Sequence, residues 1–237
     1  METPVNAPIK EKIRLEFVKL REMNFKEKRE YIWEYYKFHI VCFFVLIFIL
    51  ISVLNIYVFN PRPDTVLFIS WNAGFATDEQ IDALIDALEE RLVDKDANEE
   101  VAISQVFFSS GDAEADMANV QRTVAMIAAG MIDVFIADLN LLRDYANVGY
   151  LQPLDSVLAE IRAKNPEVYR RIEENIISAP TETNQEEKEE RMVGISIGSS
   201  PLFTRLGIFR QELYIGVAIS STKLDNVAEA IIMLFEE

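Results

Sequence analysis

Cysteine and histidine are almost absent from this sequence, since its 237 residues contain one of each, Cys42 and His39. A single cysteine excludes an internal disulfide, and one cysteine with one histidine excludes a structural zinc site that needs four such ligands. Positive charge is also scarce, with 23 Lys and Arg against 39 Asp and Glu and a formal net charge of −16. An excess of negative charge repels phosphate backbones, so we expect no nucleic-acid partner.

The hydrophobic residues, half of the total, are concentrated in an uncharged run at residues 40–59. A helix of about 20 residues spans about 30 Å, the thickness of the hydrocarbon core of a bilayer. We therefore predict one transmembrane helix over residues 39–60, with the lipid bilayer as a partner. A buried core helix would carry a polar stripe. A cleaved signal peptide does not fit, because 39 residues precede the run and no small-x-small cleavage site follows it.

The charges that flank this run predict its orientation. Residues 20–38 hold five Lys and Arg, whereas residues 60–78 hold one. Because positively charged loops stay in the cytoplasm, we expect a single-pass protein of the cell membrane with a cytoplasmic N-terminus and an extracellular C-terminal domain. Residues 1–38 then carry nine positive and seven negative side chains, whereas residues 60–237 carry 14 positive and 32 negative ones.

Residues 1–38 are predicted to form a cytoplasmic amphipathic helical segment. Apolar residues recur at helical spacing over residues 9–22, and Asn24 with Glu27 forms a capping-box pattern at the start of a second helix. Pro61 and Pro63 should end that second helix outside the membrane. The first helix lies on the inner leaflet, docks on a cytoplasmic partner, or only extends the anchor. Its mixed charges make it a weak lipid binder.

Residues 61–237 are predicted to form one α/β domain, with a mainly parallel sheet and flanking helices. Short apolar strand patterns alternate with amphipathic helix patterns, which is typical of βαβ units. The expected strands are residues 65–70, 101–107, 133–137, 192–197 and 213–219. The expected helices are residues 78–93, 112–129, 139–147, 156–163, 166–178 and 224–235, with Asp78 capping the first and Gly130 ending the second. The acid-rich residues 181–190 lack apolar periodicity, so we expect a mobile loop there.

The candidate ligand site consists of polar residues that follow the first three predicted strands, since open parallel sheets bind ligands beyond the carboxyl ends of their strands. These residues are Ser70, Trp71, Asn72, Ser109, Ser110, Asp112, Asp138 and Asn140. The two serines ahead of a helix are suited to binding an anion, but helix capping by Ser110 or Asp112 is the interpretation that we favour. Trp71 either stacks on a ligand ring or packs over the sheet, and we favour packing.

No enzymatic chemistry is indicated, and we expect no cofactor and no metal site. Residues 194–198 match the pattern G-x-S-x-G, but that chemistry needs a strand-to-helix elbow and a histidine base. Residues 60–237 contain no histidine. Ser196 lies between two isoleucines in a strand pattern, so we interpret it as a sheet residue.

Residues 120–155 read VQRTVAMIAAGMIDVFIADLNLLRDYANVGYLQPLD. Here a helix ending at Gly130 precedes an Asp133-Val134 strand, a second helix ends at Gly149, and Leu-x-Pro-Leu-Asp follows. This succession resembles the extracellular solute-binding proteins of ABC importers, of the two-lobed type. The opening strand-helix-strand and the closing strand and helix resemble the same family. The stretch FKEKREYIWEYYKFHI is similar to the membrane-proximal segment of uncharacterised single-pass proteins from Gram-positive bacteria.

The resemblance implies a membrane-anchored module that binds a small molecule or peptide at the cell surface. Family members have two lobes, whereas only about 38 residues (154–191) stand where the second lobe would be built. We therefore expect a single lobe of the family's fold. The alternative is a non-enzymatic structural or regulatory subunit of a cell-envelope complex, which would use a degenerate binding fold to contact membrane or envelope proteins.

Overall fold

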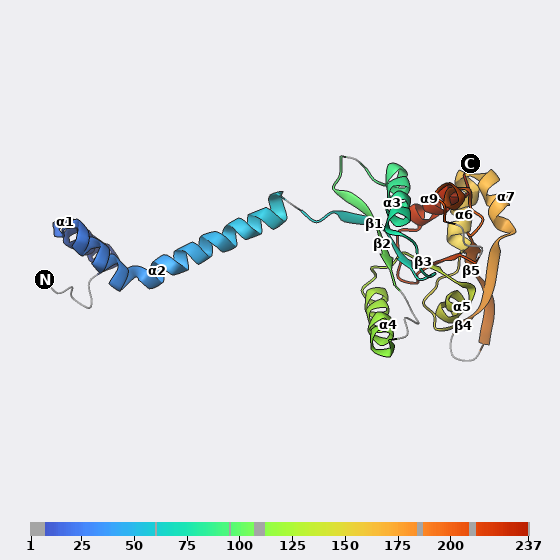
Figure 1. Ribbon diagram of the computed structural model, residues 1–237, viewed down its shortest axis with the longest axis horizontal. Coiled ribbons are helices and arrows are strands. Elements are labelled where there is room, and N and C mark those ends of the chain that lie inside the picture. Colours follow the sequence, from blue (N-terminus) through green and yellow to red (C-terminus); the bar gives the residue numbers. More distant parts are fainter. Residues whose placement is uncertain are drawn as a thin grey trace. The chain divides into compact units, whose positions relative to one another are not determined.

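The computed structural model describes residues 8–59, 61–94, 96–106, 112–183, 187–208 and 212–236. The chain separates into two compact units, Met1–Arg62 and Pro63–Glu237 (Figure 1). Each unit is described by itself below.

The N-terminal unit consists of helix α1 (Ile9–Glu22) and helix α2 (Phe25–Leu54), which a short π-helix, η1 (Asn55–Phe59), continues. The predicted capping box is confirmed, because the Asn24 side chain accepts from the first turn of α2 and the Asn24 backbone N–H donates to Glu27 at 2.9 Å. One helix in the described part of the chain, Phe25–Phe59, is long and apolar enough to cross a membrane, and none of its most apolar stretch is buried.

The C-terminal unit is built on one six-stranded sheet with the strand order β2-β1-β3-β6-β5-β4. The strands are β1 (Asp64–Trp71), β2 (Glu99–Gln105), β3 (Val134–Ala137), β4 (Ile176–Thr183), β5 (Glu187–Ser196) and β6 (Tyr214–Val217). Strand β1 pairs in parallel with β2 and β3, whereas β3 with β6, β6 with β5 and β5 with β4 are antiparallel. The α/β class is confirmed, but the sheet is mixed rather than mainly parallel.

The departure from a parallel sheet has a simple cause in the chain connections. Strands β4 and β5 follow each other as a hairpin, and a short connection can join only antiparallel neighbours. In the first half of the sheet, α3 (Asp78–Leu92) and α4 (Ala113–Ala128) link β1, β2 and β3 as the crossover helices that parallel pairing requires.

Helices cover both faces of the sheet (Figure 1). The remaining helices are α5 (Leu139–Asn147), α6 (Asp155–Lys164), α7 (Pro166–Glu173), α8 (Pro201–Arg205) and α9 (Leu224–Phe235). Side chains from α3, α6, α7, α8 and α9 form one buried cluster with Val134 and Ile136 of β3, and side chains from α4 and α5 form a second cluster with Phe135 and Ala137. The alternation along β3 places these clusters on opposite faces.

A buried carboxylate ties the start of β3 to its neighbours. Asp133 is 2% exposed and accepts from the backbone N–H of Phe68 at 2.9 Å and from the hydroxyl of Ser221 at 2.7 Å. The Lys223 ammonium lies 3.4 Å from the same carboxylate and donates to the carbonyl of Thr65. These contacts join β1, β3 and the segment before α9, and they hold β1 and β3 side by side.

Three of the sequence expectations need correction. The N-cap of α3 is Thr77, which forms a capping box with Gln80, and not Asp78. The helix expected over residues 166–178 ends at Glu173, because the chain then enters β4. The residues expected as a mobile loop, 181–190, lie largely in β4 and β5, where Thr181 pairs with Glu189 and Thr183 pairs with Glu187. Backbone hydrogen bonds extend this hairpin without any apolar periodicity.

Candidate ligand site at the carboxyl edge of the sheet

The carboxyl ends of β1 and β3 lie next to each other at a reversal of the strand order. From β1 the chain passes through α3 to β2 on one side, and from β2 it passes through α4 to β3 on the other side. In open α/β sheets the crevice at such a reversal is the usual place for a ligand. Ser70, Trp71 and Asn72 stand at this end of β1, and Asp138 follows β3 directly.

Ser70 and Asn72 are brought into direct contact there. Both side chains are buried, with Asn72 6% exposed, and the Ser70 hydroxyl donates to the Oδ1 atom of Asn72 at 2.9 Å. The Asn72 backbone N–H donates to the carbonyl of Ile136 at 2.6 Å, which attaches this residue to β3. The side chain of Asn72 is therefore fixed by both β1 and β3.

This arrangement leaves the amide nitrogen of Asn72 without a hydrogen-bond acceptor among the described residues. This nitrogen, Nδ2, is buried. Because Oδ1 accepts from Ser70, Nδ2 is the amide atom that lies away from this hydroxyl. An unpaired buried donor costs about 1–3 kcal/mol, so an unpartnered amide calls for an explanation.

Trp71 points into the core rather than toward a ligand. Its side chain is fully buried, its ring centroid lies 6.0 Å from that of Phe203 of α8, and its indole N–H donates to the carbonyl of Gly74 at 2.9 Å. The ring packs over the sheet, as we favoured from the sequence. In this conformation it offers no face on which a ligand could stack.

The two aspartates of the predicted site cap helices. Asp112 accepts from the backbone N–H groups of Glu114 at 3.0 Å and Ala115 at 3.3 Å, which confirms the capping interpretation for α4. Asp138 accepts from the N–H of Leu141 at 2.9 Å at the start of α5. Asn140 is exposed in the first turn of α5. Ser109 and Ser110 lie outside the described residues.

Two glutamines that the sequence analysis missed hold the loop after β1 in place. The Oε1 atom of Gln105 accepts from the N–H of Ala76 at 3.2 Å, and the side-chain amide of Gln80 donates to the carbonyl of Gly207 at 2.7 Å. The capping-box pattern formed by Thr77 and Gln80 would have identified Gln80 from the sequence. Gln105 carries no local signal, because its partner is distant in the chain.

The charge near this edge is negative. Asp78 and Glu79 lie in the first turn of α3, and Glu114 and Asp116 lie in the first turn of α4. Acidic side chains at helix N-termini are stabilised by the helix dipole. They also repel anions, so this edge is suited to neutral or positively charged groups and not to the anion considered from the sequence.

A buried phenol lies on α5, which follows this edge. Burial, and to a lesser degree the neighbouring Tyr150 and Asp138, raise the pKa of Tyr145 well above its usual range. The ring of Tyr145 lies 4.7 Å from that of Phe135, and its hydroxyl has no hydrogen-bond partner in the described part of the chain. Tyr145 therefore stays protonated at physiological pH and does not act as a base.

The G-x-S-x-G segment is part of the sheet. Ser196 is the last residue of β5, and its backbone N–H donates to the carbonyl of Asn175 at 2.8 Å. It does not lie at a strand-to-helix elbow, so the sheet interpretation is confirmed. Within the described ranges, no group of three or more His, Cys, Asp or Glu side chains is arranged to hold a metal ion.

No protein-family model matches this chain, and no curated protein matches it. Function is therefore argued below from the chain's own residues.

Proposed function

We propose that this protein is a single-pass membrane protein whose extracellular α/β domain binds a small polar solute at the carboxyl ends of β1 and β3. The observation that carries the proposal is the Asn72 amide, which is buried, contacts Ser70 through Oδ1, and has no acceptor for its Nδ2 group among the described residues. A ligand oxygen would supply that acceptor. The location supports the proposal as well, because reversals of strand order are where open α/β sheets bind their ligands.

The residues at this edge favour a particular ligand chemistry. The Asn72 amide donates, so the ligand must present a carbonyl, carboxylate or hydroxyl oxygen. The acidic first turns of α3 and α4 disfavour a net negative charge. Neutral sugars, zwitterionic amino acids and short peptides satisfy both conditions. We propose binding without chemical conversion of the ligand.

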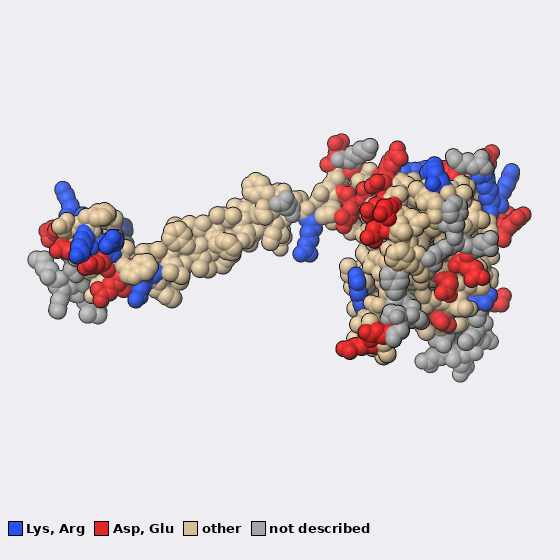
Figure 2. Space-filling model, viewed as in Figure 1, with Lys and Arg blue, Asp and Glu red and all other residues tan. Residues whose placement is uncertain are grey.

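The membrane topology is part of the proposal. Lys and Arg gather on α1 and the start of α2, and a long stretch of α2 without charge follows them (Figure 2). This asymmetry favours a cytoplasmic N-terminus and an extracellular C-terminal unit. The apolar helix then anchors the binding domain at the cell surface.

A single lobe has consequences for affinity. Residues 154–191 contribute α6, α7 and strands of the same six-stranded sheet, so in the described part of the chain they do not build a second lobe. Without a second lobe closing over it, a ligand keeps one side in water and gains less from desolvation. We therefore expect weak, rapidly exchanging binding.

A thermal-shift screen of the full-length protein in detergent tests the proposal. Sugars, amino acids, short peptides and inorganic anions would be added to wild type, Asn72→Ala and the control variant Asn98→Ala, whose exposed residue precedes β2 at the opposite edge of the sheet. A ligand at about 100 times its Kd stabilises a folded protein by about 2.7 kcal/mol. We expect stabilisation of wild type and Asn98→Ala by one neutral or zwitterionic class, and none of Asn72→Ala. An equal response of all three proteins, or no response to any class, would refute solute binding at this site.

A second candidate function is favoured by the surface of α4. Met117 is 59% exposed, and Val120 and Val124 follow it on the same side of the helix, so that α4 presents an apolar stripe to solvent. Such stripes on a folded domain mark contact surfaces for other proteins. Under this alternative the protein is a structural or regulatory subunit that binds an apolar face of another envelope protein. Crosslinking in native membranes, compared between wild type and Val120→Glu, distinguishes it: recovery of the protein alone in both cases would exclude this role.

A further inference from the structure

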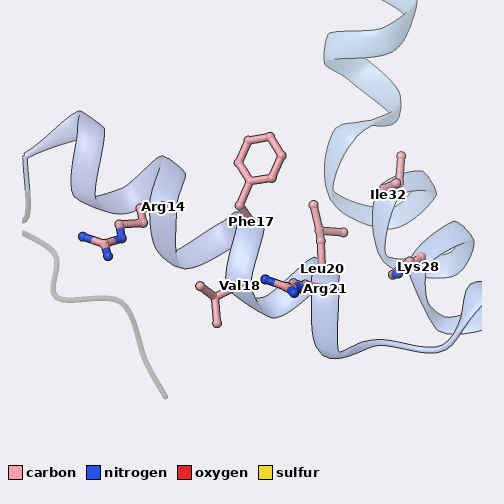
Figure 3. Close-up of a pocket in the computed structure, with 7 residues that line it drawn as sticks. All are labelled: Arg14, Phe17, Val18, Leu20, Arg21, Lys28 and Ile32. Atoms are coloured by element: carbon pink, nitrogen blue, oxygen red, sulfur yellow. The ribbon is translucent and has the colours of Figure 1, made fainter.

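A groove opens between α1 and α2 in the N-terminal unit. It has a volume of about 530 Å³, and its lining combines three cations with four apolar residues: Arg14, Phe17, Val18, Leu20, Arg21, Lys28 and Ile32. In Figure 3, Phe17 and Leu20 extend to the same side of α1, while Lys28 and Ile32 stand on the adjacent first turns of α2. We call this feature the α1–α2 groove.

The apolar part of the α1–α2 groove is uncovered. Phe17 is 69% exposed, and Val18 and Ile32 are also exposed. Full burial of a side chain such as Phe or Ile is worth about 1.5–3 kcal/mol, so an apolar segment that filled the groove would bind favourably. Among the side chains that the structure describes, the lining contains no carboxylate, and no ion pair joins Arg14, Arg21 or Lys28 to an acidic group.

The distance between the α1–α2 groove and the bilayer argues against a lipid headgroup as the occupant of the groove. Lys28 precedes Ile40, the first residue of the apolar run, by 12 residues of continuous helix, or about 18 Å at 1.5 Å per residue. The headgroup layer on each side of a bilayer is only about 5–8 Å thick. A tilt of about 20° shortens the distance by about 1 Å. Lys28 therefore stands about 10 Å beyond the lipid phosphates, where salt already screens their attraction.

We infer that the α1–α2 groove binds an acidic amphipathic helix of a cytoplasmic protein. The apolar face of that helix would pack against Phe17, Leu20 and Ile32, as amphipathic segments bind in hydrophobic grooves. Its carboxylates would pair with Arg14, Arg21 and Lys28 at the rim, which provides orientation and selectivity. This inference depends on the membrane topology proposed above but not on solute binding by the C-terminal unit.

A designed peptide tests the inference on the full-length protein in nanodiscs of phosphatidylcholine. The probe is a fluorescent helical peptide with Leu at helical spacing and Glu on its flanks, and the control peptide carries Lys in place of every Glu. We expect the acidic peptide to bind more tightly than the basic one. The triple variant Arg14→Glu, Arg21→Glu, Lys28→Glu should weaken that binding about tenfold or more, since several partly exposed ion pairs add up to that factor. The matched variant Lys26→Glu, Arg29→Glu changes nearby cations outside the groove and should bind like wild type.

Two outcomes of the peptide titration overturn the inference: equal affinity for both peptides, or an equal loss in the triple and the matched variant. Nanodiscs rich in phosphatidylserine test the lipid alternative, and loss of peptide binding there would show that lipid occupies the groove. A photo-crosslinking residue in place of Phe17 identifies the occupant in cells. A crosslink to an acidic amphipathic segment of another protein supports the inference, whereas adducts with lipid alone or with a second copy of this chain overturn it.

Discussion

The hydroxyl of Ser70 donates to the Oδ1 atom of Asn72 across 2.9 Å at the end of β1. The bond joins the Asn72 amide to β1, and the backbone N–H of Asn72 donates to the Ile136 carbonyl, which attaches the residue to β3. The remaining amide N–H groups lack a partner among the described residues. Ser70 is therefore a positioning residue for Asn72 in the proposed solute site.

Replacing Ser70 by Ala should release the Asn72 amide. We expect a loss of about 1 kcal/mol in the free energy of unfolding, because one buried hydrogen bond disappears. Solute affinity should fall as well, since the amide becomes free to turn over. Urea unfolding and ligand titration would measure both, with the exposed Ser199→Ala as the control. A variant that binds solute like wild type would show that Ser70 has no positioning role.

Gly194 lies so close to α5 that it leaves no room for a side chain. A Cβ atom at this position would overlap Cδ2 of Leu142 and stand 3.4 Å from the carbonyl oxygen of Ile215. We expect Gly194→Ala to reduce the free energy of unfolding by about 1–3 kcal/mol, the usual range for overpacking. Packing against α5 thus explains the first glycine of the G-x-S-x-G pattern, Gly194.

A double-mutant cycle tests this explanation. Leu142→Ala alone should destabilise the domain by opening a cavity, but it should offset part of the Gly194→Ala penalty because it removes the clashing methyl group. Unfolding midpoints of the four proteins in denaturant give the coupling energy. Strictly additive effects would mean that the close approach of these two residues does not limit stability.

A pH-dependent contribution to stability should come from the surface pair Glu160 and Asp225. Hydrogen bonds from Lys164 and, to a lesser degree, from Glu160 lower the pKa of Asp225, whereas the hydrogen bond to Asp225 raises the pKa of Glu160. The Asp225 contribution is present above the ordinary Asp pKa of about 3.9 and is lost as the pH falls through the lowered value. The Glu160 contribution has the opposite pH dependence. It is present below the ordinary Glu pKa and is lost as the pH rises through the raised pKa.

Asp225→Asn should therefore reduce the dependence of the free energy of unfolding on pH in the acidic range. Denaturant unfolding at a series of pH values around and below about 4 would show wild type losing stability more steeply than the variant. Asp144→Asn on the exposed side of α5 is the control. Parallel curves for wild type and Asp225→Asn would contradict the role of this pair.

The proposed topology predicts which cysteines can be labelled from outside the cell. In a Cys42→Ser background, Ser199→Cys should react with a membrane-impermeant maleimide on intact cells, whereas Glu22→Cys should react only after permeabilisation. Cys42 itself lies within the apolar helix, which is why it must be removed first. The reverse labelling pattern would place the C-terminal unit in the cytoplasm.

Local patterns in the sequence predicted a large part of this fold. Helices at residues 139–147 and 224–235 have the predicted bounds, and the caps at Asn24 and Asp112 are confirmed, because each depends on side chains only a few residues apart. The antiparallel half of the sheet was not predicted. The outer part of the β4–β5 hairpin is polar and pairs through its backbone, so its composition resembled that of a loop.

The sequence predicted which polar residues follow the strands but not the contacts that those residues make. The strand order that brings β1 beside β3 placed Ser70, Asn72 and Asp138 at one edge. Which of them cap helices and which contact each other depends on side-chain orientations across the sheet. The burial of Trp71 against Phe203 of α8 joins residues that are far apart in the chain, and α8 had no recognised pattern in the sequence.

The side-chain amide of Asn72 provides the most direct test of the account. Its nitrogen and protons can be followed by NMR in the ¹⁵N-labelled protein while solutes from the thermal-shift screen are added. We predict that a neutral or zwitterionic solute shifts the Asn72 amide resonances with saturation, and leaves those of the exposed Asn98 amide, at the opposite edge of the sheet, unchanged. If solutes that stabilise the protein leave the Asn72 amide unmoved, solute binding at the carboxyl ends of β1 and β3 is contradicted.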